Sequence, residues 1–386
     1  MWQKNVRYLD YNASSGISPF VTSQLTEVLN SGLLFANPTS RHRLGQSVRH
    51  ALYEASLKIA KSFGESIQTD DLVFTSSGTE ANQTVLRSIA EDVDLLVMGA
   101  GEHSASYEMI AHLSKAEIFE LPLLPSGQYD FNALVLALEK ARSGGIKKVG
   151  LSLFWANNET GVLTDLSSLK EILLSSGLRC ILHLDGAQAW GKTPFDLAAN
   201  QADFTTFSAH KIGAPAGTGI IVIKKGNRLK PLFLGSQAHG LRGGTENTLG
   251  ILATAAAADK LHPLNFSKHT LPLIQALEKG LLQLSTPVRL WGNEVSRVPN
   301  TSRFSFSGFT GYENWVELID LKGFAVSHGS ACKAQVIEPS RVLLKMGASR
   351  EEALNSLRVS FGPDNTEDDV SNFLIALQEI LETKRK

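Results

Sequence analysis

The sequence predicts an α/β fold in which a mainly parallel sheet is covered by helices on both faces. The first observation is a series of short apolar runs with the length and composition of buried strands. The second is that stretches with helical periodicity, such as FNALVLALEKARSGG and LSSLKEILLSSG, lie between most of these runs and end at glycine. Strands and helices in alternation are typical of such a sheet. The apolar runs are DLVFT (71–75), LLVMG (95–99), KVGLSLF (148–154), CILHLD (180–185), DFTTFS (203–208) and TGIIVIK (218–224).

The length of the chain predicts a second, smaller domain. With 386 residues the chain exceeds the size at which one hydrophobic core stops growing. The alternation loosens after DKLHPLNFSKH, so we place a domain boundary near residue 263. Beyond it, helices mix with short strands such as SRFSF and SLRVSF, which indicates an α+β unit. The stretch TEDDVSNFLIALQEILE has one apolar face and predicts a helix that packs on this unit.

The composition excludes several classes of protein. Hydrophobic residues make up 43% of the chain and charged residues 19%, as in an ordinary globular protein. The 37 basic and 38 acidic side chains nearly balance, so nucleic acid is not an expected partner. Two cysteines make no disulfide framework and suit a reducing compartment, so we expect a cytoplasmic protein. The most apolar stretches are too short for a membrane span, and none is expected.

Polar residues follow several predicted strands, at the edge of the sheet where open α/β proteins bind their ligands. After the run 71–75, a turn of small residues leads into a helix, whose free N–H groups near Gly78 and Thr79 could hold a phosphate. An ordinary capped helix would explain the same pattern. After the run 203–208, Ser208 and His210 could also donate to an anion.

Three further side chains at this edge have both a structural and a chemical explanation. Asp185 ends an apolar strand, where a carboxylate needs a cationic ligand, a salt bridge or a helix to cap. His103, in GEHSASYE, could stack on a planar ligand or pack in the core. Lys211, in FSAHKIGAPAGTG, could be solvated or could condense with a carbonyl group.

Together these residues favour one ligand with a phosphate, a flat ring that carries a basic nitrogen, and a carbonyl group. Pyridoxal 5'-phosphate has all three, and it requires a lysine Schiff base and an acidic partner for its ring nitrogen. Cys332, in AVSHGSACKAQ, could lie on an exposed loop from which a thiolate reaches this ligand, although most free thiols are inert. Cys180 opens an apolar strand and is expected to be a small buried residue.

A series of segments along nearly the whole chain resembles one known family, the cysteine desulfurases. These are fold-type-I pyridoxal-phosphate enzymes that pass sulfur from L-cysteine to a protein persulfide. The resemblance implies a seven-stranded sheet in a large domain (16–262) and a small domain (1–15 and 263–386) that carries the cysteine. The segments, in family order, are YLDYNASSG, NPTSRHRLG, FTSSGTEAN, GEHSA, ANNETG, LDGAQAWGK, FSAHKIGAPAGTG, LRGGTEN, GSAC and LRVSFG.

The resemblance also implies a role for each matching residue. Lys211 would bind the cofactor covalently and form the catalytic set with Cys332 and His103. Asn37 and Arg358 would bind the substrate carboxylate, a task that suits the donor fork of arginine. Thr245 would reach the phosphate held by the other subunit, which implies a homodimer. The remaining cofactor-binding residues would be Gly78, Thr79, Asn158, Asp185, Gln188, Ser208 and His210, and no metal is expected.

The reaction implied by the resemblance gives L-alanine and a persulfide on Cys332. Its sulfur would pass to an acceptor or scaffold protein, in iron–sulfur cluster assembly or tRNA thiolation. One alternative is a related pyridoxal-phosphate enzyme, such as a selenocysteine lyase or an aminotransferase, and amino-acid turnover by a Cys332→Ser variant would favour it. Another is a catalytically weak scaffold that binds sulfur acceptors, which the absence of alanine formation from L-cysteine would indicate.

Overall fold

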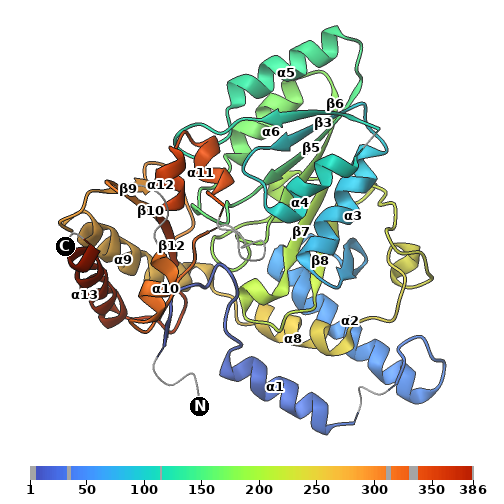
Figure 1. Cartoon of the computed structure of the whole chain (residues 1–386). Helices are drawn as coiled ribbons and strands as arrows, with labels where there is room; N and C mark the ends of the chain where they lie inside the picture. Colours follow the sequence, from blue (N-terminus) through green and yellow to red (C-terminus); the bar gives the residue numbers. More distant parts are fainter. Residues whose placement is uncertain (1–5, 33–35, 114, 310–313, 330–337, 385–386) are drawn as a thin grey trace.

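A seven-stranded sheet forms the centre of the computed structural model (Figure 1). The structure describes residues 6–32, 36–113, 115–309, 314–329 and 338–384. Within the sheet, one strand is antiparallel to both of its neighbours and all other pairs are parallel, so the predicted mainly parallel sheet is confirmed. That strand is β8. The strands in spatial order are β2 (Leu72–Thr75), β8 (Gly219–Ile223), β7 (Phe204–Ser208), β6 (Arg179–Asp185), β5 (Lys148–Phe154), β3 (Leu95–Gly99) and β4 (Glu117–Leu121).

Six of these strands lie where the apolar runs predict them, and the seventh, β4, does not follow from such a run. Its sequence, EIFEL, contains two glutamates, and β4 pairs only with β3 at the edge of the sheet. An edge strand is partly exposed to water and does not need the continuous apolar sequence of a central strand.

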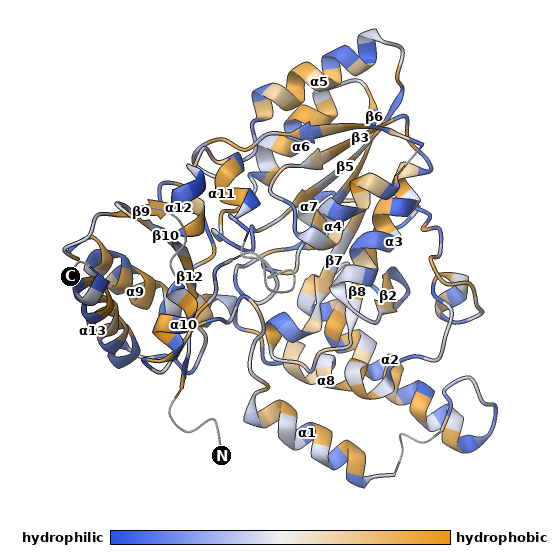
Figure 2. Ribbon diagram, viewed as in Figure 1, coloured by the Kyte–Doolittle hydropathy of each residue, from blue (hydrophilic) through white to orange (hydrophobic). Residues whose placement is uncertain are grey.

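The two faces of the sheet are covered by different helices, as the alternation of side chains along a strand requires. On β8, Ile220 and Val222 join one core, whereas Ile221 and Ile223 join another on the opposite face. The helices show hydrophobic and hydrophilic residues side by side around their circumference (Figure 2). The first core includes residues of α2 (Arg43–Phe63), α5 (Phe131–Ser143), α6 (Leu166–Ser175) and α8 (Thr248–Ala258), and the second includes residues of α3 (Gly78–Ala90).

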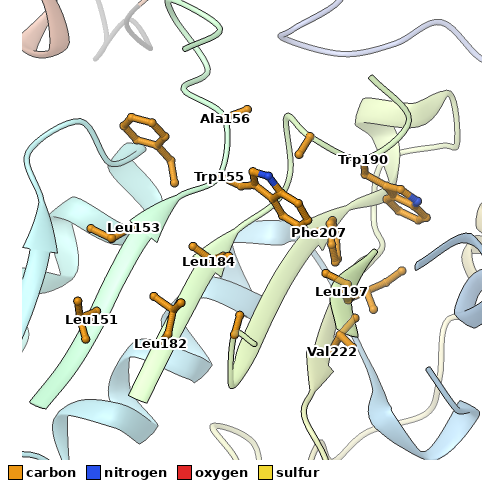
Figure 3. Packing of buried hydrophobic residues seen from close by; sticks show 14 of the residues in the cluster. Leu151, Leu153, Trp155, Ala156, Leu182, Leu184, Trp190, Leu197, Phe207 and Val222 are labelled. Atoms are coloured by element: carbon orange, nitrogen blue, oxygen red, sulfur yellow. The ribbon is translucent and has the colours of Figure 1, made fainter. Parts of the chain in front are cut away.

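An aromatic group fixes the carboxyl end of β7. The ring of Phe207 lies 4.4 Å from that of Phe63 and 5.5 Å from that of Trp190, measured between centroids. Phe207 and Trp190 lie close to the leucines of the neighbouring strands (Figure 3). Because interiors are close-packed, this group fixes the backbone at Ser208, the next residue along the chain.

A second, smaller core lies beside the sheet and combines Leu9 with residues from 273 onward. Its three-stranded antiparallel sheet has the order β12 (Ser356–Ser360), β10 (Thr301–Phe306) and β9 (Val288–Trp291), and it packs with α9 (Pro263–Leu281) and α13 (Glu367–Lys384). The proposed division into domains at residue 263 coincides with the start of α9, although Trp291 and Val342 belong to the first core. The other elements before residue 15 and after residue 263 are β1 (Arg7–Tyr8), α10 (Trp315–Asp320), β11 (Phe324–Ala325), α11 (Arg341–Lys345) and α12 (Arg350–Leu354).

Short helices complete the chain between these elements. They are α1 (Pro19–Asn30), α4 (Ser104–Tyr107) and α7 (Leu197–Asn200), with single turns at Thr69–Asp71, Glu108–His112, Ala209–Ile212 and Ala238–Gly240. Among the helices of the described residues, none has the length and apolar character needed to cross a bilayer.

Candidate active site

A cavity of about 400 Å³ lies at the carboxyl ends of the parallel strands, as the sequence predicts for the ligand site. Its walls come from segments that are far apart in the sequence, including the N-terminal segment at Asn12 and the small core at Ser327. Most of the predicted site residues meet here. They are Gly78, Thr79, His103, Asn158, Asp185, Gln188, Ser208, His210, Lys211 and Arg358.

Three predicted site residues are not brought to this cavity by the described chain. Asn37 is exposed, and its Oδ1 accepts hydrogen bonds from the N–H of Thr39 at 2.9 Å and from its hydroxyl at 2.8 Å. Thr245 is also exposed, in the loop before α8. Cys332 lies outside the described residues.

The turn between β2 and α3 has the form of an anion site. Ser77 caps α3 by accepting the N–H of Glu80 at 3.1 Å, so the first turn of the helix points its N–H groups toward the cavity edge at Gly78 and Thr79. A Cβ on Gly78 would lie 3.0 Å from the Cβ of Ser208, so a glycine allows these two segments of the chain to approach closely. The predicted phosphate donors therefore lie side by side.

Hydrogen bonds hold two side chains at this turn and beside it, Glu80 and His210. Glu80 accepts two hydrogen bonds from Arg242, at 2.9 and 3.2 Å, and further ones from the hydroxyl and N–H of Ser76. In the turn after β7, Nδ1 of His210 lies 3.2 Å from the hydroxyl of Ser14. Burial, reinforced by Lys211, lowers the pKa of His210 to about 4, so its ring is neutral and carries one N–H.

Asp185 lies on the cavity wall without a cationic partner. Its Oδ2 accepts from Asn82 at 2.7 Å and its Oδ1 accepts from the N–H of Ala187 at 3.0 Å. The second bond lies within the turn that follows β6, where there is no helix for Asp185 to cap. Among the described residues no lysine, arginine or histidine forms a salt bridge with this carboxylate. A carboxylate with 9% exposure and no cation beside it favours a positively charged ligand atom.

A chain of buried hydrogen bonds behind Asp185 was not found from the sequence. Asn82 accepts from the hydroxyl of Thr206, which lies 3.0 Å from Nε2 of His183, and Nδ1 of His183 lies 2.9 Å from the hydroxyl of Ser152. Burial lowers the pKa of His183 to about 4, so this chain is neutral. It holds the amide of Asn82 in one orientation, and Asn82 in turn holds the carboxylate. The sequences of β6 and β7 contain a signal for it, because the polar residues His183 and Thr206 stand within buried strands.

His103 presents a neutral ring to the cavity. Its Nδ1 accepts the N–H of Ala105 at 3.1 Å at the start of α4, which leaves the ring proton on Nε2. Burial is the largest cause that lowers the pKa of His103, and Lys211 adds to it. A neutral imidazole fixed by its own helix cap is suited to stack on a planar ligand, the use predicted for it.

Lys211 follows β7 in a single turn of 3₁₀-helix, Ala209–Ile212, that ends at Gly213 with φ of +90°. Its Nζ donates to the carbonyl of Asn12 at 2.7 Å and to that of Ala13 at 2.8 Å. Burial, followed by the nearby Arg358, lowers the pKa of Lys211 to about 8. These hydrogen bonds and the lowered pKa disfavour the solvated alternative, because much more of the amine is neutral and nucleophilic near neutral pH than in an ordinary lysine.

We expect this lowered pKa to appear in the reactivity of the cofactor-free protein. Only the neutral amine reacts with an activated ester, so acylation of Lys211 should rise with pH and level off above about pH 8. Acylation of the exposed Lys225 in the same samples is the comparison. Mass spectrometry of the lysine-containing peptides measures both rates, and a Lys211 rate that still rises at pH 10 would contradict the assignment.

Two residues that the sequence did not reveal, Asn12 and Lys192, connect Lys211 to Gln188 on the cavity wall. The amine of Lys192 donates to Oδ1 of Asn12 at 2.7 Å and to Oε1 of Gln188, while Nε2 of Gln188 donates to the carbonyl of Asn12 at 2.9 Å. Lys192 is 4% exposed, and burial lowers its pKa well below the ordinary value, with Lys211 adding to the effect. These bonds fix the side chain of Gln188 at the cavity wall.

Arg358 is a buried cation on the wall formed by β12. Its Nη2 lies 2.6 Å from Oδ1 of Asp10, and its Nη1 donates to the carbonyl of Asn158 at 2.9 Å. Its Nε is buried without a hydrogen-bond partner among the described residues. A buried donor that lacks an acceptor favours a ligand oxygen at this position, as a substrate carboxylate would supply.

Comparison with known proteins agrees with this geometry. The chain matches the family model described as aminotransferase class-V over residues 7–373. It is 31% identical to a cysteine desulfurase of Gluconacetobacter diazotrophicus, over 99% of this chain and 95% of the relative. It is 33% identical to a cysteine desulfurase of Cereibacter sphaeroides, over 98% of this chain and 96% of the relative.

A solved structure shows the same fold over the whole length. The NifS-like protein from Rickettsia africae superposes with a TM-score of 0.88 and 28% identity, covering 98% of this chain and 99% of that protein. Sequence, fold and cavity therefore agree, and the chain belongs to the aminotransferase class-V family, in the branch that contains the cysteine desulfurases.

Proposed function

We propose that the protein is a cysteine desulfurase that uses pyridoxal 5'-phosphate to convert L-cysteine into L-alanine and a persulfide on Cys332. The observation that supports this most directly is the placement of Asp185 and Lys211 on one cavity. The carboxylate has no cationic partner among the described residues, and the amine has a pKa of about 8. A carboxylate and a nucleophilic amine are the two groups that this cofactor requires.

The residues of the cavity fit the cofactor. The turn at Gly78 and Thr79, with Ser208 and His210, would hold its phosphate, and Asp185 would pair with its ring nitrogen. The ring of His103 would stack on it, with Asn158 and Gln188 near its hydroxyl group. When bound, the pyridoxal ring supplies an electron sink for the carbon from which a proton is removed.

The chain's own residues would bind the substrate and move its proton. The guanidinium of Arg358, held by Asp10, would take the carboxylate of L-cysteine through its free Nε. Once it is free, the amine of Lys211 would accept the α-proton and later return one, because its pKa of about 8 lies close to neutral pH. The mostly buried setting keeps water away from this proton.

Cys332 would receive the sulfur, because the other cysteine lies at the wrong end of the sheet. Cys180 is the second residue of β6 and Asp185 is the last, which separates them by about 17 Å along the strand. Burial also raises the pKa of the Cys180 thiol, which disfavours its thiolate. In the step proposed for Cys332, its thiolate forms an S–S bond to the substrate sulfur as the C–S bond breaks. The electron pair of that bond remains with the substrate, which takes up a proton and leaves as alanine.

The exposed positions of two predicted site residues suit a homodimer. Thr245 and Asn37 both lie away from the cavity of their own chain. We infer that Thr245 contacts the phosphate in the other subunit, and that Asn37 joins the substrate site only in the assembled enzyme. The persulfide sulfur would then pass to an acceptor protein, in iron–sulfur cluster assembly or tRNA thiolation.

The decisive experiment is incubation of the cofactor-loaded protein with L-cysteine. We expect alanine, sulfide when a reductant is present, and a mass increase of one sulfur on the peptide that contains Cys332. Because the chain has only two cysteines, the peptide with Cys180 is an internal control. A persulfide on Cys180 would refute the assigned nucleophile, and a lack of alanine would refute the enzyme.

A further inference from the structure

A buried ion pair outside the cavity wall joins the two parts of the molecule. Arg303, on β10, is 0% exposed, and Glu159, in the loop after β5, is 5% exposed. Nη2 of Arg303 lies 3.5 Å from Oε2 of Glu159. Removing two charges from water offsets most of their attraction, so such a pair contributes little net stability. Its remaining contacts indicate what it does.

The pair binds the chain on both sides of the segment 330–337. On the N-terminal side, Nη1 of Arg303 donates to the carbonyl of His328 at 2.6 Å. On the C-terminal side, the hydroxyl of Ser340 donates to Oε2 of Glu159 at 2.6 Å. The same hydroxyl accepts the N–H of Leu343 at 3.1 Å and so caps α11. One ion pair therefore fixes the chain at residues 328 and 340.

Gly329 is shaped to lie against this pair. Its φ is +92°, and a Cβ there would lie 2.6 Å from Nη1 of Arg303 and 2.8 Å from Oε2 of Glu159. Only a glycine allows the backbone to approach both charged groups this closely. Gly329 also lines the cavity, so the ion pair lies directly behind the cavity wall at this residue.

The backbone of Glu159 is held on the cavity side as well. The N–H of Glu159 donates to Oδ1 of Asn157 at 2.9 Å. The residue between them, Asn158, lines the cavity and accepts from Arg358 through its carbonyl at 2.9 Å. Glu159 is thus one peptide bond from the substrate site and one hydrogen bond from Ser340.

We propose that Arg303 and Glu159 are positioning residues for sulfur transfer, which hold the chain on either side of Cys332 in register with the substrate site. This inference rests on the proposed function of Cys332. It predicts that loss of the pair slows the attack on the substrate sulfur and leaves substrate binding and proton removal unchanged.

The test separates these steps in the cofactor-loaded enzyme. In Glu159→Gln, a single turnover with L-cysteine should form the persulfide about 10- to 100-fold more slowly, since small misplacements of a reacting group cost this much. The KM for L-cysteine and the exchange of the α-proton of L-alanine in deuterated water should stay at wild-type values. Gly329→Ala, which keeps both charges, should slow the persulfide step in the same way.

The control is a half-buried ion pair beside the same strand. Nη2 of Arg297 lies 2.6 Å from Oε2 of Glu278. Glu278 also accepts a hydrogen bond from the hydroxyl of Ser302. Ser302 precedes Arg303 on β10, so its side chain points to the opposite face of that strand. Glu278→Gln should lower stability without changing the persulfide rate. An unchanged persulfide rate in Glu159→Gln, or an equal loss of proton exchange, would overturn the proposal.

Hydrogen exchange distinguishes this result from a failure of the proposed function. If wild-type protein formed no persulfide on Cys332, the proposed function would be refuted whatever the variants do. The backbone amides of peptides covering 326–329 and 338–343 should still exchange faster in Glu159→Gln than in the wild type or in Glu278→Gln. Unchanged exchange there would refute the structural basis of the inference.

Discussion

Lys211→Ala should abolish turnover, with a loss of about 10⁴-fold or more in alanine formation from L-cysteine. The substitution removes both the group that binds the aldehyde covalently and the group that moves the substrate proton. The neighbouring Lys192 cannot replace it, because its amine is held by Asn12 and Gln188. Alanine release and the mass of the borohydride-reduced protein measure the two losses.

The fold should tolerate this substitution. Burial disfavours the charged amine of Lys211, so its removal relieves a desolvation cost and the melting temperature of the cofactor-free protein should not fall. Lys260→Ala is the control, since Lys260 is exposed and its Nζ lies over the ring of Phe20 at 4.3 Å from the centroid. Appreciable turnover by Lys211→Ala without an added amine would exclude Lys211 as the reactive lysine.

Asp185→Asn should lower kcat by about 10² to 10³-fold, the range found when one preorganised charge or donor is removed from an active site. The substitution keeps the shape of the side chain but removes the negative charge that faces the cavity. Cofactor binding should persist, because Lys211 and the turn at Gly78 are unchanged. Steady-state kinetics should therefore show the lowered kcat, whereas the absorbance of the bound cofactor should still be present in this variant.

A matched carboxylate at the other end of the same strands provides the control. Oδ2 of Asp203 accepts the N–H of Leu182 at 2.8 Å, and its Oδ1 accepts from Asn227 at 2.9 Å, far from the cavity. Asp203→Asn should change stability but leave kcat within about twofold, since it removes no charge from the site. A kcat near the wild-type value in Asp185→Asn would mean that this carboxylate does not serve the cofactor.

The elements that the sequence predicted best are those whose pattern is local. The strand ending at Asp185 and the helix after Gly78 follow from apolar runs and turn residues, and their polar ends meet as expected for a parallel sheet. The strand β4 was missed because an edge strand with two glutamates has no such pattern. Tertiary pairing with β3, rather than local sequence, decides its conformation.

The residues that the sequence did not reveal depend on contacts between distant segments. Asn12, Asn82 and Lys192 are ordinary polar residues until the fold buries them together. Nothing in the local sequence of Lys192 shows that its amine will meet Asn12, 180 residues away. Thr245 and Asn37 remain predictions for the same reason, because their proposed partners lie on another chain.

The contacts of Asn12 bear on how late in synthesis the cavity of the enzyme can form. Its Nδ2 donates to Thr301, its N–H to Ser360, and its carbonyl accepts from Lys211. The segment that receives the reactive amine is thus synthesised well before its own anchors, which follow 289 and 348 residues later. Contacts of such long range form late in folding. The nascent chain can build most of the central sheet earlier, but the cavity wall at Asn12 is completed only after Ser360 has been synthesised.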